Sequence, residues 1–409
     1  MPQRSTTVSP AAASSDVAAV LDQKAPLLVC FSHLRWDFVW QRPQHLLSRA
    51  AKHYRVLVIE EPMFEPGIAP TMDVSRRPGG ITIAVPKLPK GLSEPDVILE
   101  QRELVEELIG RESSVPRVFW YYTPMAMAFS NHLECDLCVY DNMDELSAFN
   151  GASRELLDLE KELFARADVV FTGGMSLYEA KRSRHRNVHG FPSSIEFDHF
   201  AQARRFDGAE PADQAGLPRP RLGFFGVIDE RMDVGLVGEV AALRPGWHFV
   251  MLGPVVKIDP AILPKRDNIH WLGGKSYKDL PRYLARWDIG FMPFALNEAT
   301  RFISPTKTPE FLAAGVPVVS TPIADVVRPY GEKGLVEIAK TPLEVVRKAE
   351  TLLSRPKQGW LSRVDRHLAA GSWDKTWAAM NKLMSEAMGG VASDRTAPVP
   401  GYVLTTPAE

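Results

Sequence analysis

Short runs of apolar residues recur along this chain, and polar loops or amphipathic stretches separate them. The runs are rich in β-branched and aromatic side chains, which predicts buried strands. We expect strands at residues 27–32, 55–60, 81–85, 117–122, 137–140, 168–172, 221–227, 247–252, 269–272, 288–293 and 317–320. We expect helices at residues 44–52, 94–109, 153–166, 177–186, 310–314, 341–353 and 372–387. Strands that alternate with helices predict an α/β fold with doubly wound parallel sheets.

The length of the chain and one polar interval predict two domains. A chain of 409 residues is longer than a single core comfortably supports. Residues 202–220 are polar and contain glycine and three prolines, which is typical of a linker. We expect these segments in chain order: a disordered tail at 1–24, an N-terminal domain at 25–201, the linker at 202–220, a C-terminal domain at 221–370, a final helix at 371–388 and a disordered tail at 389–409.

Composition and charge exclude several classes of protein. Charged residues make up 24% of the chain, apolar residues 45%, and the net charge is −2, which argues against binding nucleic acid through bulk charge. No segment has the character of a secretory signal or approaches the ~20 apolar residues of a spanning helix. Three cysteines predict a reducing compartment. Cys135 and Cys138 form a lone C-x-x-C, and we expect core thiols there. We therefore expect a cytoplasmic protein.

The stretch from 302 to 321 carries the clearest chemistry. Ser304 and Thr306 stand in a loop that leads into a short helix, and Lys307 and Glu310 follow one turn apart. Free backbone N–H groups and a cation suit a phosphate group, and a carboxylate can accept hydrogen bonds from sugar hydroxyls. This pattern predicts a site for a diphosphate and a sugar. An ordinary helix–strand unit with a solvated lysine and glutamate is the alternative.

A second phosphate-binding loop is predicted at the start of the C-terminal domain. Gly226 ends its first strand, where a glycine lets a ligand approach the backbone. Arg231 follows and can bind a phosphate with two hydrogen bonds, or it is a surface residue. The spacing is not that of a G-x-G-x-x-G dinucleotide site, which disfavours NAD. We expect no cofactor and, without an Asp-x-Asp signature, no metal.

The loop after the first strand is unusually rich in stacking and hydrogen-bonding groups. It contains Arg35, Trp36, Trp40 and Arg42. Ligands of open α/β sheets bind beyond the carboxyl ends of the strands, so we expect this loop to face a cleft and bind an acceptor. The alternative is that both tryptophans pack beneath the loop. Asp141, Asp144 and Glu145 follow another strand at the same edge, where these carboxylates could bind an acceptor hydroxyl or a metal. The alternative is that Asp144 or Asn142 only caps the next helix.

The basic run at residues 181–186 leaves two interpretations open. It can be a solvated helix end, or it can contact an anionic membrane surface or a lipid diphosphate. The second interpretation would place the protein peripherally at the cytoplasmic face of the membrane.

These motifs resemble those of GT-B glycosyltransferases, in particular bacterial family 1 and family 4 types of cell-surface polysaccharide pathways. The E-x-x-A-x-G-x-P-V segment is Glu310 to Val318, the loop at 32–44 resembles S-x-x-x-W-x-x-x-x-Q-R-P-Q, and Ser372-Trp373 resembles the start of a terminal helix that crosses back to the N-terminal domain. The resemblance implies that Gly273 and Lys275 lie in the segment that holds the nucleotide base. It also implies that Asp141 lies near the reaction centre. Retaining members carry an earlier glutamate where this chain has Phe302, which leaves the stereochemistry open.

The resemblance implies two Rossmann-like domains facing across a cleft and a metal-independent hexosyltransferase. The donor would be a UDP- or GDP-sugar, and the acceptor a glycan or a lipid-linked molecule. Catalytic roles fall to Asp141 and Glu310. The expected donor site contains Gly226, Arg231, Gly273, Lys275, Ser304, Thr306, Lys307 and Glu310, and the expected acceptor site contains Arg35, Trp36 and Arg42. Two alternatives are a nucleotide-sugar 2-epimerase of the same fold and a nucleotide-sugar-binding protein without catalysis.

Overall fold

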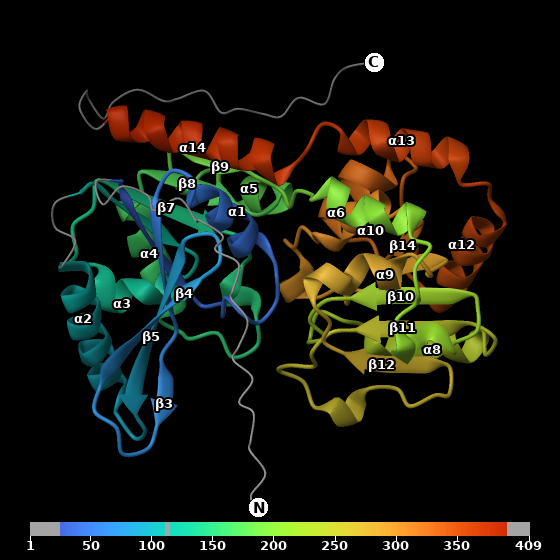
Figure 1. The fold of residues 1–409 in the computed structure, drawn as a ribbon, viewed down its shortest axis with the longest axis horizontal. Coiled ribbons are helices and arrows are strands. Elements are labelled where there is room, and N and C mark those ends of the chain that lie inside the picture. Colours follow the sequence, from blue (N-terminus) through green and yellow to red (C-terminus); the bar gives the residue numbers. More distant parts are fainter. Residues whose placement is uncertain (1–24, 111–114, 391–409) are drawn as a thin grey trace, which may run out of the picture.

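A computed structural model describes residues 25–110 and 115–390, which form two α/β domains side by side (Figure 1). Each has a sheet of mainly parallel strands. In the described part of the N-terminal domain the strands are β1 (Leu27–Ser32), β2 (Arg55–Glu60), β3 (Met63–Glu65), β4 (Thr71–Arg77), β5 (Ile81–Pro89), β6 (Arg117–Tyr121), β7 (Leu137–Asn142), β8 (Val169–Thr172) and β9 (Val188–Gly190). In the C-terminal domain they are β10 (Arg221–Phe225), β11 (His248–Leu252), β12 (Ile269–Gly273), β13 (Ile289–Met292), β14 (Val318–Ser320) and β15 (Glu337–Ile338). The predicted α/β class is confirmed.

The N-terminal sheet runs in the order β3-β5-β2-β1-β6-β7-β8-β9, and β4 pairs antiparallel with β5. β1 is buried along its whole length between β2 and β6, which explains its continuous apolar sequence. The antiparallel β4 was not predicted, because its residues are mostly exposed and carry no apolar alternation.

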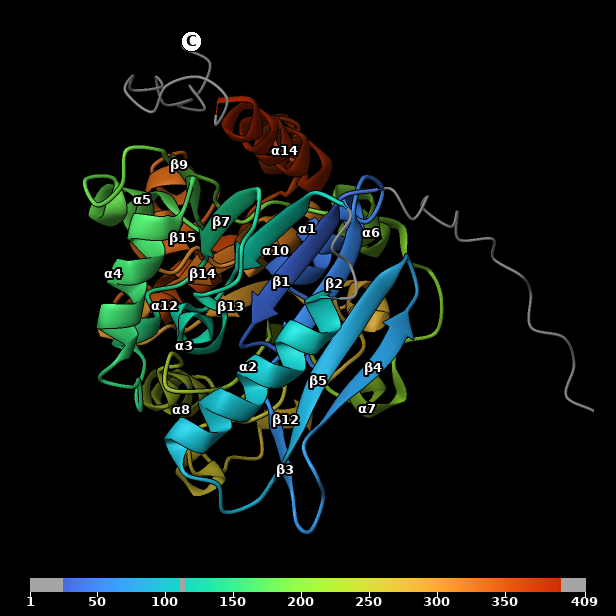
Figure 2. The ribbon, with the colours of Figure 1, turned by 90° about the vertical axis from the view of Figure 1, so that its left-hand side faces the viewer.

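Helices cover both faces of this sheet, and α2 lies across its outer side in Figure 2. The helices of this half are α1 (Arg42–Ala50), α2 (Glu94–Gly110), α3 (Met127–Ser130), α4 (Leu156–Arg166), α5 (Met175–Lys181) and α6 (Phe197–Ala201). The helix predicted at 177–186 is shorter and begins earlier than expected, because Gly174 precedes its first turn and basic residues after Lys181 turn away.

The C-terminal sheet is parallel throughout, in the order β12-β11-β10-β13-β14-β15. Its helices are α8 (Val234–Leu243), α9 (Leu280–Leu284), α10 (Lys307–Ala313), α11 (Ala324–Val326), α12 (Pro342–Ser354) and α13 (Gln358–Leu368). Gly290 in β13 allows α10 to pack directly on the sheet: a Cβ there would lie 2.7 Å from the ring of Phe311. This close packing fixes the start of α10 at the carboxyl edge of the sheet.

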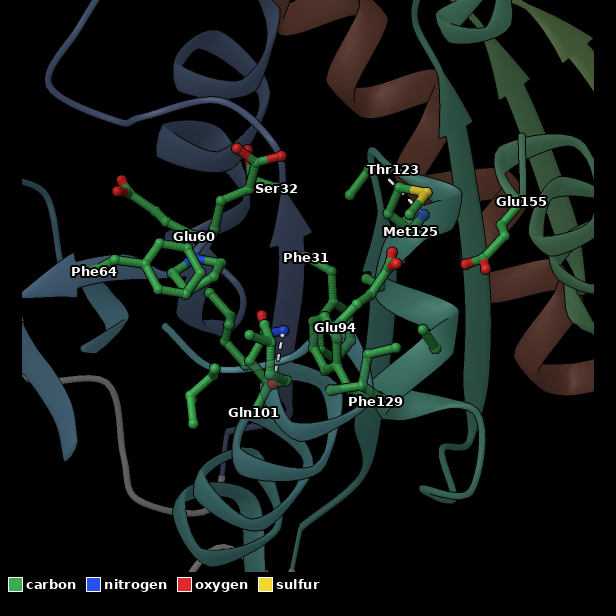
Figure 3. Close-up of a pocket in the computed structure, with 18 of the residues that line it drawn as sticks. Phe31, Ser32, Glu60, Phe64, Glu94, Gln101, Thr123, Met125, Phe129 and Glu155 are labelled. Carbon is green, nitrogen blue, oxygen red and sulfur yellow. Dashed lines mark hydrogen bonds between the residues drawn. The ribbon is translucent and has the colours of Figure 1, made fainter. Parts of the chain in front are cut away.

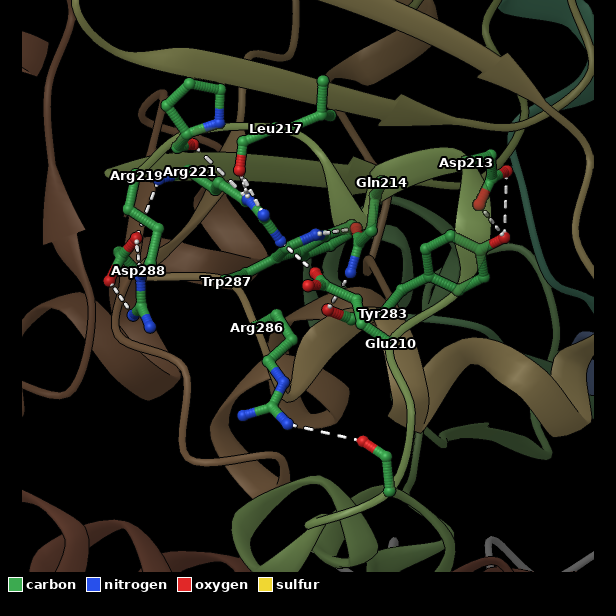
Figure 4. A network of polar contacts seen from close by, with 12 residues as sticks. Glu210, Asp213, Gln214, Leu217, Arg219, Arg221, Tyr283, Arg286, Trp287 and Asp288 are labelled. Carbon is green, nitrogen blue, oxygen red and sulfur yellow. Dashed lines mark hydrogen bonds and ion pairs between the residues drawn. The ribbon is translucent and has the colours of Figure 1, made fainter.

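The segment predicted as a linker is held firmly to the C-terminal domain (Figure 4). It contains α7 (Ala212–Ala215), whose Gln214 is fully buried, donates to the Tyr283 carbonyl (3.2 Å) and accepts from Trp287 Nε1 (3.0 Å). Arg221 forms an ion pair with Glu210 of the same segment. The polar composition of residues 202–220 therefore reflects specific hydrogen bonds.

The last described helix, α14 (Trp373–Gly390), leaves the C-terminal domain and packs along the N-terminal one (Figure 1). Trp373, Trp377, Met380 and Met384 are buried in one cluster with β1, β6, β7 and β8. The helix predicted at 371–388 corresponds to α14. Within the described ranges, no helix is long and apolar enough to cross a bilayer. Residues 1–24 and 391–409 lie outside the described residues, and 389–390, which were predicted as part of a tail at 389–409, belong to α14.

Candidate active site

A cleft of about 860 Å³ lies between the two domains at the carboxyl ends of both sheets. The N-terminal domain contributes the loop that follows β1, from Trp36 to Gln41. The C-terminal domain contributes the loops after β10, β11 and β12 and the first turn of α10. Parallel strands place their ligands at this edge, so the cleft lies where the sequence predicted it.

Lys307 occupies the floor of this cleft, beside the end of β10. A Cβ on Gly226, which has φ +130°, would lie 2.1 Å from the Cε and 2.5 Å from the Nζ of Lys307. The ammonium also lies 5.6 Å from the centre of the Phe224 ring. Only a glycine at position 226 leaves room for this lysine. Among the described residues Lys307 makes no ion pair.

The surroundings of Lys307 destabilise its charged form. Burial, and then the neighbouring charge of Arg231, lower the pKa of Lys307 to about 8. Burial likewise raises the pKa of Glu310, one turn along α10, to about 7. Both shifts disfavour the charged forms, so Lys307 and Glu310 do not neutralise each other fully. An anion entering the cleft would stabilise the ammonium.

Arg231 lies in the same cleft, but its guanidinium is already occupied. Its Nε and Nη2 donate to Asp229 at 2.7–3.1 Å, and its Cζ lies 5.5 Å from the centre of the Phe149 ring of the N-terminal domain. Arg231 was predicted as a free phosphate clamp. In the structure it is preoriented by Asp229 and supplies positive charge from a fixed position.

A smaller hollow of about 100 Å³ continues from the cleft toward the N-terminal domain. Ser304, Thr306 and Lys307 line it from one side, and Asp144 and Ser193 from the other. Ser193 Oγ donates to the Ser304 carbonyl at 2.7 Å, which ties the predicted donor loop to the N-terminal domain. Burial raises the pKa of Asp144. From the sequence, Asp144 was one of three carboxylates at the end of β7 that could bind a hydroxyl or a metal, or cap the next helix, but it was not chosen as a site residue.

Asp141 and Arg42 contact each other, and Arg42 also lines the smaller hollow, whereas Asp141 lines neither the hollow nor the cleft. Asp141 is fully buried, and Arg42 donates to both of its carboxylate oxygens at 2.8–3.2 Å and to the Phe191 carbonyl at 2.8 Å. The acceptor role of Arg42 and the catalytic role of Asp141 stay predictions. A buried carboxylate requires a partner, and this pair fixes α1 to β7 beneath the cleft.

The side chains of Arg35 and Trp36 lie in different places, although the sequence predicted that both bind the acceptor. Arg35 donates to Glu60 Oε2 (3.0 Å) and to the carbonyls of Glu61 and Pro62, so it holds the end of β2 and does not line the cleft. Trp36 lines the cleft with only 9% of its surface exposed. The sequence left two alternatives for Trp36, packing beneath the loop or facing the cleft. In the structure Trp36 is mostly buried and also contributes to the cleft lining.

An aromatic wall joins the two domains along one side of the cleft. Trp40 of the loop after β1 stacks on Tyr277, with ring centres 5.8 Å apart, and His199 stacks on the other side of Tyr277 at 4.4 Å. The segment predicted to hold a nucleotide base leads into this wall. Gly273 has φ +70° at the end of β12, and Lys275 lines the cleft while paired with Asp213 at 2.7 Å.

The position eight residues before Glu310 carries no carboxylate. Phe302 is half-buried, with the guanidinium of Arg301 5.1 Å from its ring centre. Glu298, the nearest upstream glutamate, is 76% exposed and pairs with Arg301. Neither residue supplies an acidic group to the cleft.

On the side away from the cleft, a carboxylate of one domain caps a helix of the other. Asp325 accepts from the backbone N–H groups of Met175 (2.8 Å) and Ser176 (3.0 Å) at the start of α5. A Cβ on Gly174 would lie 2.3 Å from Asp325 Oδ2, so the contact also requires this glycine. We call this contact the interdomain cap.

Two of the five basic residues in the run at 181–186 form ion pairs with Glu160. Lys181 is 4% exposed and pairs with Glu160 (2.9 Å) and Glu145 (2.7 Å), and Arg184 also pairs with Glu160. Lys181 therefore belongs to an internal charge cluster, whereas Arg182, Arg184 and Arg186 are exposed.

Comparison with known proteins supports this description. Residues 219–355 match the model of a family described as glycosyl transferases group 1. Over 235 residues the chain is 26% identical to TuaH of Bacillus subtilis strain 168, a protein named as a teichuronic acid biosynthesis glycosyltransferase. That match covers 53% of this chain and 59% of TuaH, so the chain spans about three fifths of this relative.

Solved structures match over almost the whole chain. Sucrose-phosphate synthase of Thermosynechococcus elongatus has a TM-score of 0.64 at 14% identity and covers 90% of this chain and 100% of its own. The E. coli trehalose-6-phosphate structure with UDP-2-fluoro glucose has a TM-score of 0.62 at 13% identity, covering 88% and 98%. The catalytic domain of Arabidopsis thaliana starch synthase IV, bound to ADP and acarbose, has a TM-score of 0.62 at 11% identity, covering 89% and 99%. These likenesses establish the predicted GT-B fold.

Proposed function

We propose that this chain, with its GT-B fold and a C-terminal domain that matches the glycosyl transferases group 1 family, transfers a sugar from a nucleotide-sugar to a hydroxyl acceptor. The observation that carries the proposal is the cationic floor of the cleft. Lys307 is held against Gly226 and forms no ion pair with a described residue, and Arg231 is fixed beside it. The nearby carboxylates of Glu310, Asp229 and Asp144 favour its charge only in part. A departing nucleoside diphosphate supplies a directly paired negative charge.

In this proposal the residues of the cleft act by electrostatics and positioning. Lys307 and Arg231 stabilise the negative charge that develops on the diphosphate as the glycosidic bond breaks. Glu310 accepts hydrogen bonds from ribose hydroxyls, and Ser304 and Thr306 line the path between the diphosphate and the sugar. The cationic side chains make a metal ion unnecessary, so we propose a metal-independent hexosyltransferase. Arg42 and Asp141 keep the reaction centre in place from below.

The small hollow beside the cleft suggests where the donor sugar sits. Asp144 faces Arg231 and Lys307 there, and burial disfavours its ionised form. A carboxyl group in that position can bind a sugar hydroxyl as either acceptor or donor. We propose that Asp144 takes the role that the sequence assigned to Asp141. The aromatic wall of Trp40 and Tyr277 supports a place for the base beside Gly273 and Lys275.

A donor screen tests the proposal directly. The full chain is mixed with UDP-, GDP- and ADP-sugars, and release of nucleoside diphosphate and formation of a glycosylated product are both measured. We expect one donor class to bind and to transfer its sugar. Donor isomerisation without transfer would favour a 2-epimerase, and binding without either reaction would favour a protein that only binds the donor. The names of the family and of the curated relative favour transfer.

The membrane and pathway assignments remain separate proposals. The glycosyltransferase named for teichuronic acid synthesis supports a role in cell-surface polysaccharide synthesis. Contact with the cytoplasmic face of the membrane was predicted from residues 181–186, and the ion pairs of Lys181 and Arg184 weaken that argument. Co-sedimentation with vesicles that contain anionic lipid would test it.

A further inference from the structure

A second hollow, of about 790 Å³, lies within the N-terminal domain at the carboxyl ends of β1 and β2 (Figure 3). Its walls are apolar and come from β1, β2, β3, α2 and α3. The side chains that matter most are Phe31, Ile59, Phe64, Ile98, Met125 and Phe129. A cavity of this size and lining is typical of a small-molecule site. None of the residues that line this hollow belongs to the cleft described above.

The mouth of this hollow exposes apolar side chains to water. Phe64 is 44% exposed and lines the hollow, and its neighbour Met63 is 46% exposed. Leu99, next to the lining residue Ile98, is 51% exposed. Of these three residues only Phe64 lines the hollow, and its exposed ring at the mouth favours an apolar ligand that covers it.

The polar groups of the hollow are predominantly carboxylates. Glu60, Glu61, Glu94 and Glu155 line it, and Lys90 is the single basic residue among its described lining residues. Glu60 is neutralised by Arg35 (3.0 Å) and also accepts from the Trp36 N–H (2.7 Å). The remaining charge is negative, so the hollow repels phosphate groups and accepts hydrogen bonds from hydroxyls.

The hollow lies at the same carboxyl edge of the N-terminal sheet that faces the cleft. Ser32, at the end of β1, and Thr123, just beyond β6, both line it. Burial raises the pKa of Glu61, and the positive charge of Lys257 in the C-terminal domain lowers it, so the two residues lie near each other. Glu60 and Glu61 therefore lie at the sheet edge nearest the C-terminal domain.

We propose, on the premise of the proposed function, that this hollow binds the acceptor, and that the acceptor is an uncharged amphiphile. Its hydroxyl-bearing head lies at the rim formed by Glu60, Glu61 and Glu94, with one hydroxyl directed toward the donor. Its apolar aglycone or chain lies against Phe64, Ile98 and Phe129. An acceptor with a phosphate on the part that enters the hollow is rejected by the carboxylates.

Binding of three probes to the full chain, in the presence of UDP, tests this proposal without requiring turnover. The probes are octyl β-glucoside below its micelle concentration, glucose and glucose 6-phosphate, followed by saturation-transfer NMR. We expect octyl β-glucoside to bind at least tenfold more tightly than glucose, with the alkyl protons most strongly saturated, and glucose 6-phosphate to bind weakest. Equal binding of glucose 6-phosphate and octyl β-glucoside, or no binding of the latter, overturns the proposal.

Two variants locate the binding. Ala128 lines the hollow, so Ala128→Phe should fill it and weaken octyl β-glucoside binding at least tenfold, whereas Ala152→Phe, on an exposed loop outside it, should not. Glu94→Lys alters an exposed rim residue at the start of α2, and it should increase glucose 6-phosphate binding at least fivefold. Glu103→Lys, exposed on the same helix but not in the lining, is its control.

The outcomes separate this proposal from the proposed function. If both test variants behave like their controls, the hollow does not bind the acceptor. If Ala128→Phe does not fold, the charge reversal at Glu94 decides alone. Failure of the proposed function would instead appear as absent UDP binding and absent transfer with every acceptor, while octyl β-glucoside still bound in the hollow.

Discussion

Lys307 is the residue on which the proposed donor site most depends. Its ammonium is confined by Gly226, lies near Arg231 and forms no ion pair with a described residue. A positive charge placed in this way is stabilised when a diphosphate binds. A side chain at position 226 would have to displace the end of Lys307 and would be strained at φ +130°.

We expect Lys307→Ala to weaken binding of nucleoside diphosphate and nucleotide-sugar by about 1.5–3 kcal/mol, since one charge-assisted hydrogen bond is lost. Isothermal calorimetry with UDP, GDP and ADP measures the effect. Lys278→Ala is the control, because Lys278 is an exposed lysine at the edge of the same cleft. Unchanged affinity for all three nucleotides in Lys307→Ala would exclude Lys307 from the diphosphate site.

The titration of Lys307 leads to a second prediction at this scale. Its pKa is lowered to about 8 in the free protein, so the ammonium is present below pH 8 and is lost as the pH rises through that value. UDP affinity should therefore fall by up to about tenfold per pH unit above pH 8. Calorimetry between pH 7 and 9.5 measures the slope. Lys307→Ala should lack this part of the pH dependence, and an equal slope in that variant would assign it to the nucleotide instead.

At the scale of single residues, the sequence identified candidate cleft residues better than it identified which side chains contact each other. Lys307, Glu310, Gly226 and Thr306 could be chosen because loops at strand ends are local in sequence. The pairing of Arg42 with Asp141 joins residues 99 positions apart, so no local pattern distinguished an acceptor-binding arginine from a buried one. The same holds for Asp144, whose position opposite Ser304 depends on how the two domains meet.

At the level of elements, the apolar runs identified most strands of both sheets. What the sequence did not reveal were β3, β4, β9 and β15, which are short or exposed, and α13, whose apolar positions were not recognised as helical. The segment at 202–220 was misjudged for a different reason. Polar residues are typical of linkers, but here Gln214 and Arg221 use their polar groups in buried hydrogen bonds.

The start of α5 gives a prediction for an element. Asp325→Ala removes both hydrogen bonds of the interdomain cap, and loss of a helix cap costs about 0.5–2 kcal/mol. We expect the domains to separate more readily, seen as a larger radius of gyration in solution scattering and faster proteolysis between the domains. Asp259→Ala, which removes a cap within the C-terminal domain alone, is the control. Equal scattering from both variants would show that the cap does not hold the domains together.

For the whole molecule, the proposal assigns charge neutralisation to side chains from the C-terminal domain. Sugar transfer should therefore persist within about twofold after dialysis against EDTA, because cations at fixed positions replace a metal in stabilising the leaving diphosphate. The measurement is the rate of nucleotide release with and without added Mg²⁺ or Mn²⁺. Activity abolished by EDTA and restored by either ion would show that Lys307 and Arg231 are insufficient.

The path of α14 has a consequence for the order in which the protein can be made. Trp373, Trp377, Met380 and Met384 complete the core of the N-terminal domain, yet a ribosome synthesises them after every strand of the C-terminal sheet. The first domain to emerge must therefore wait, with the surface of β1 and β7 uncovered, until the second has been translated. A nascent chain arrested near residue 370 should hold a folded second domain and an unfinished first one, which is the form that a chaperone would meet.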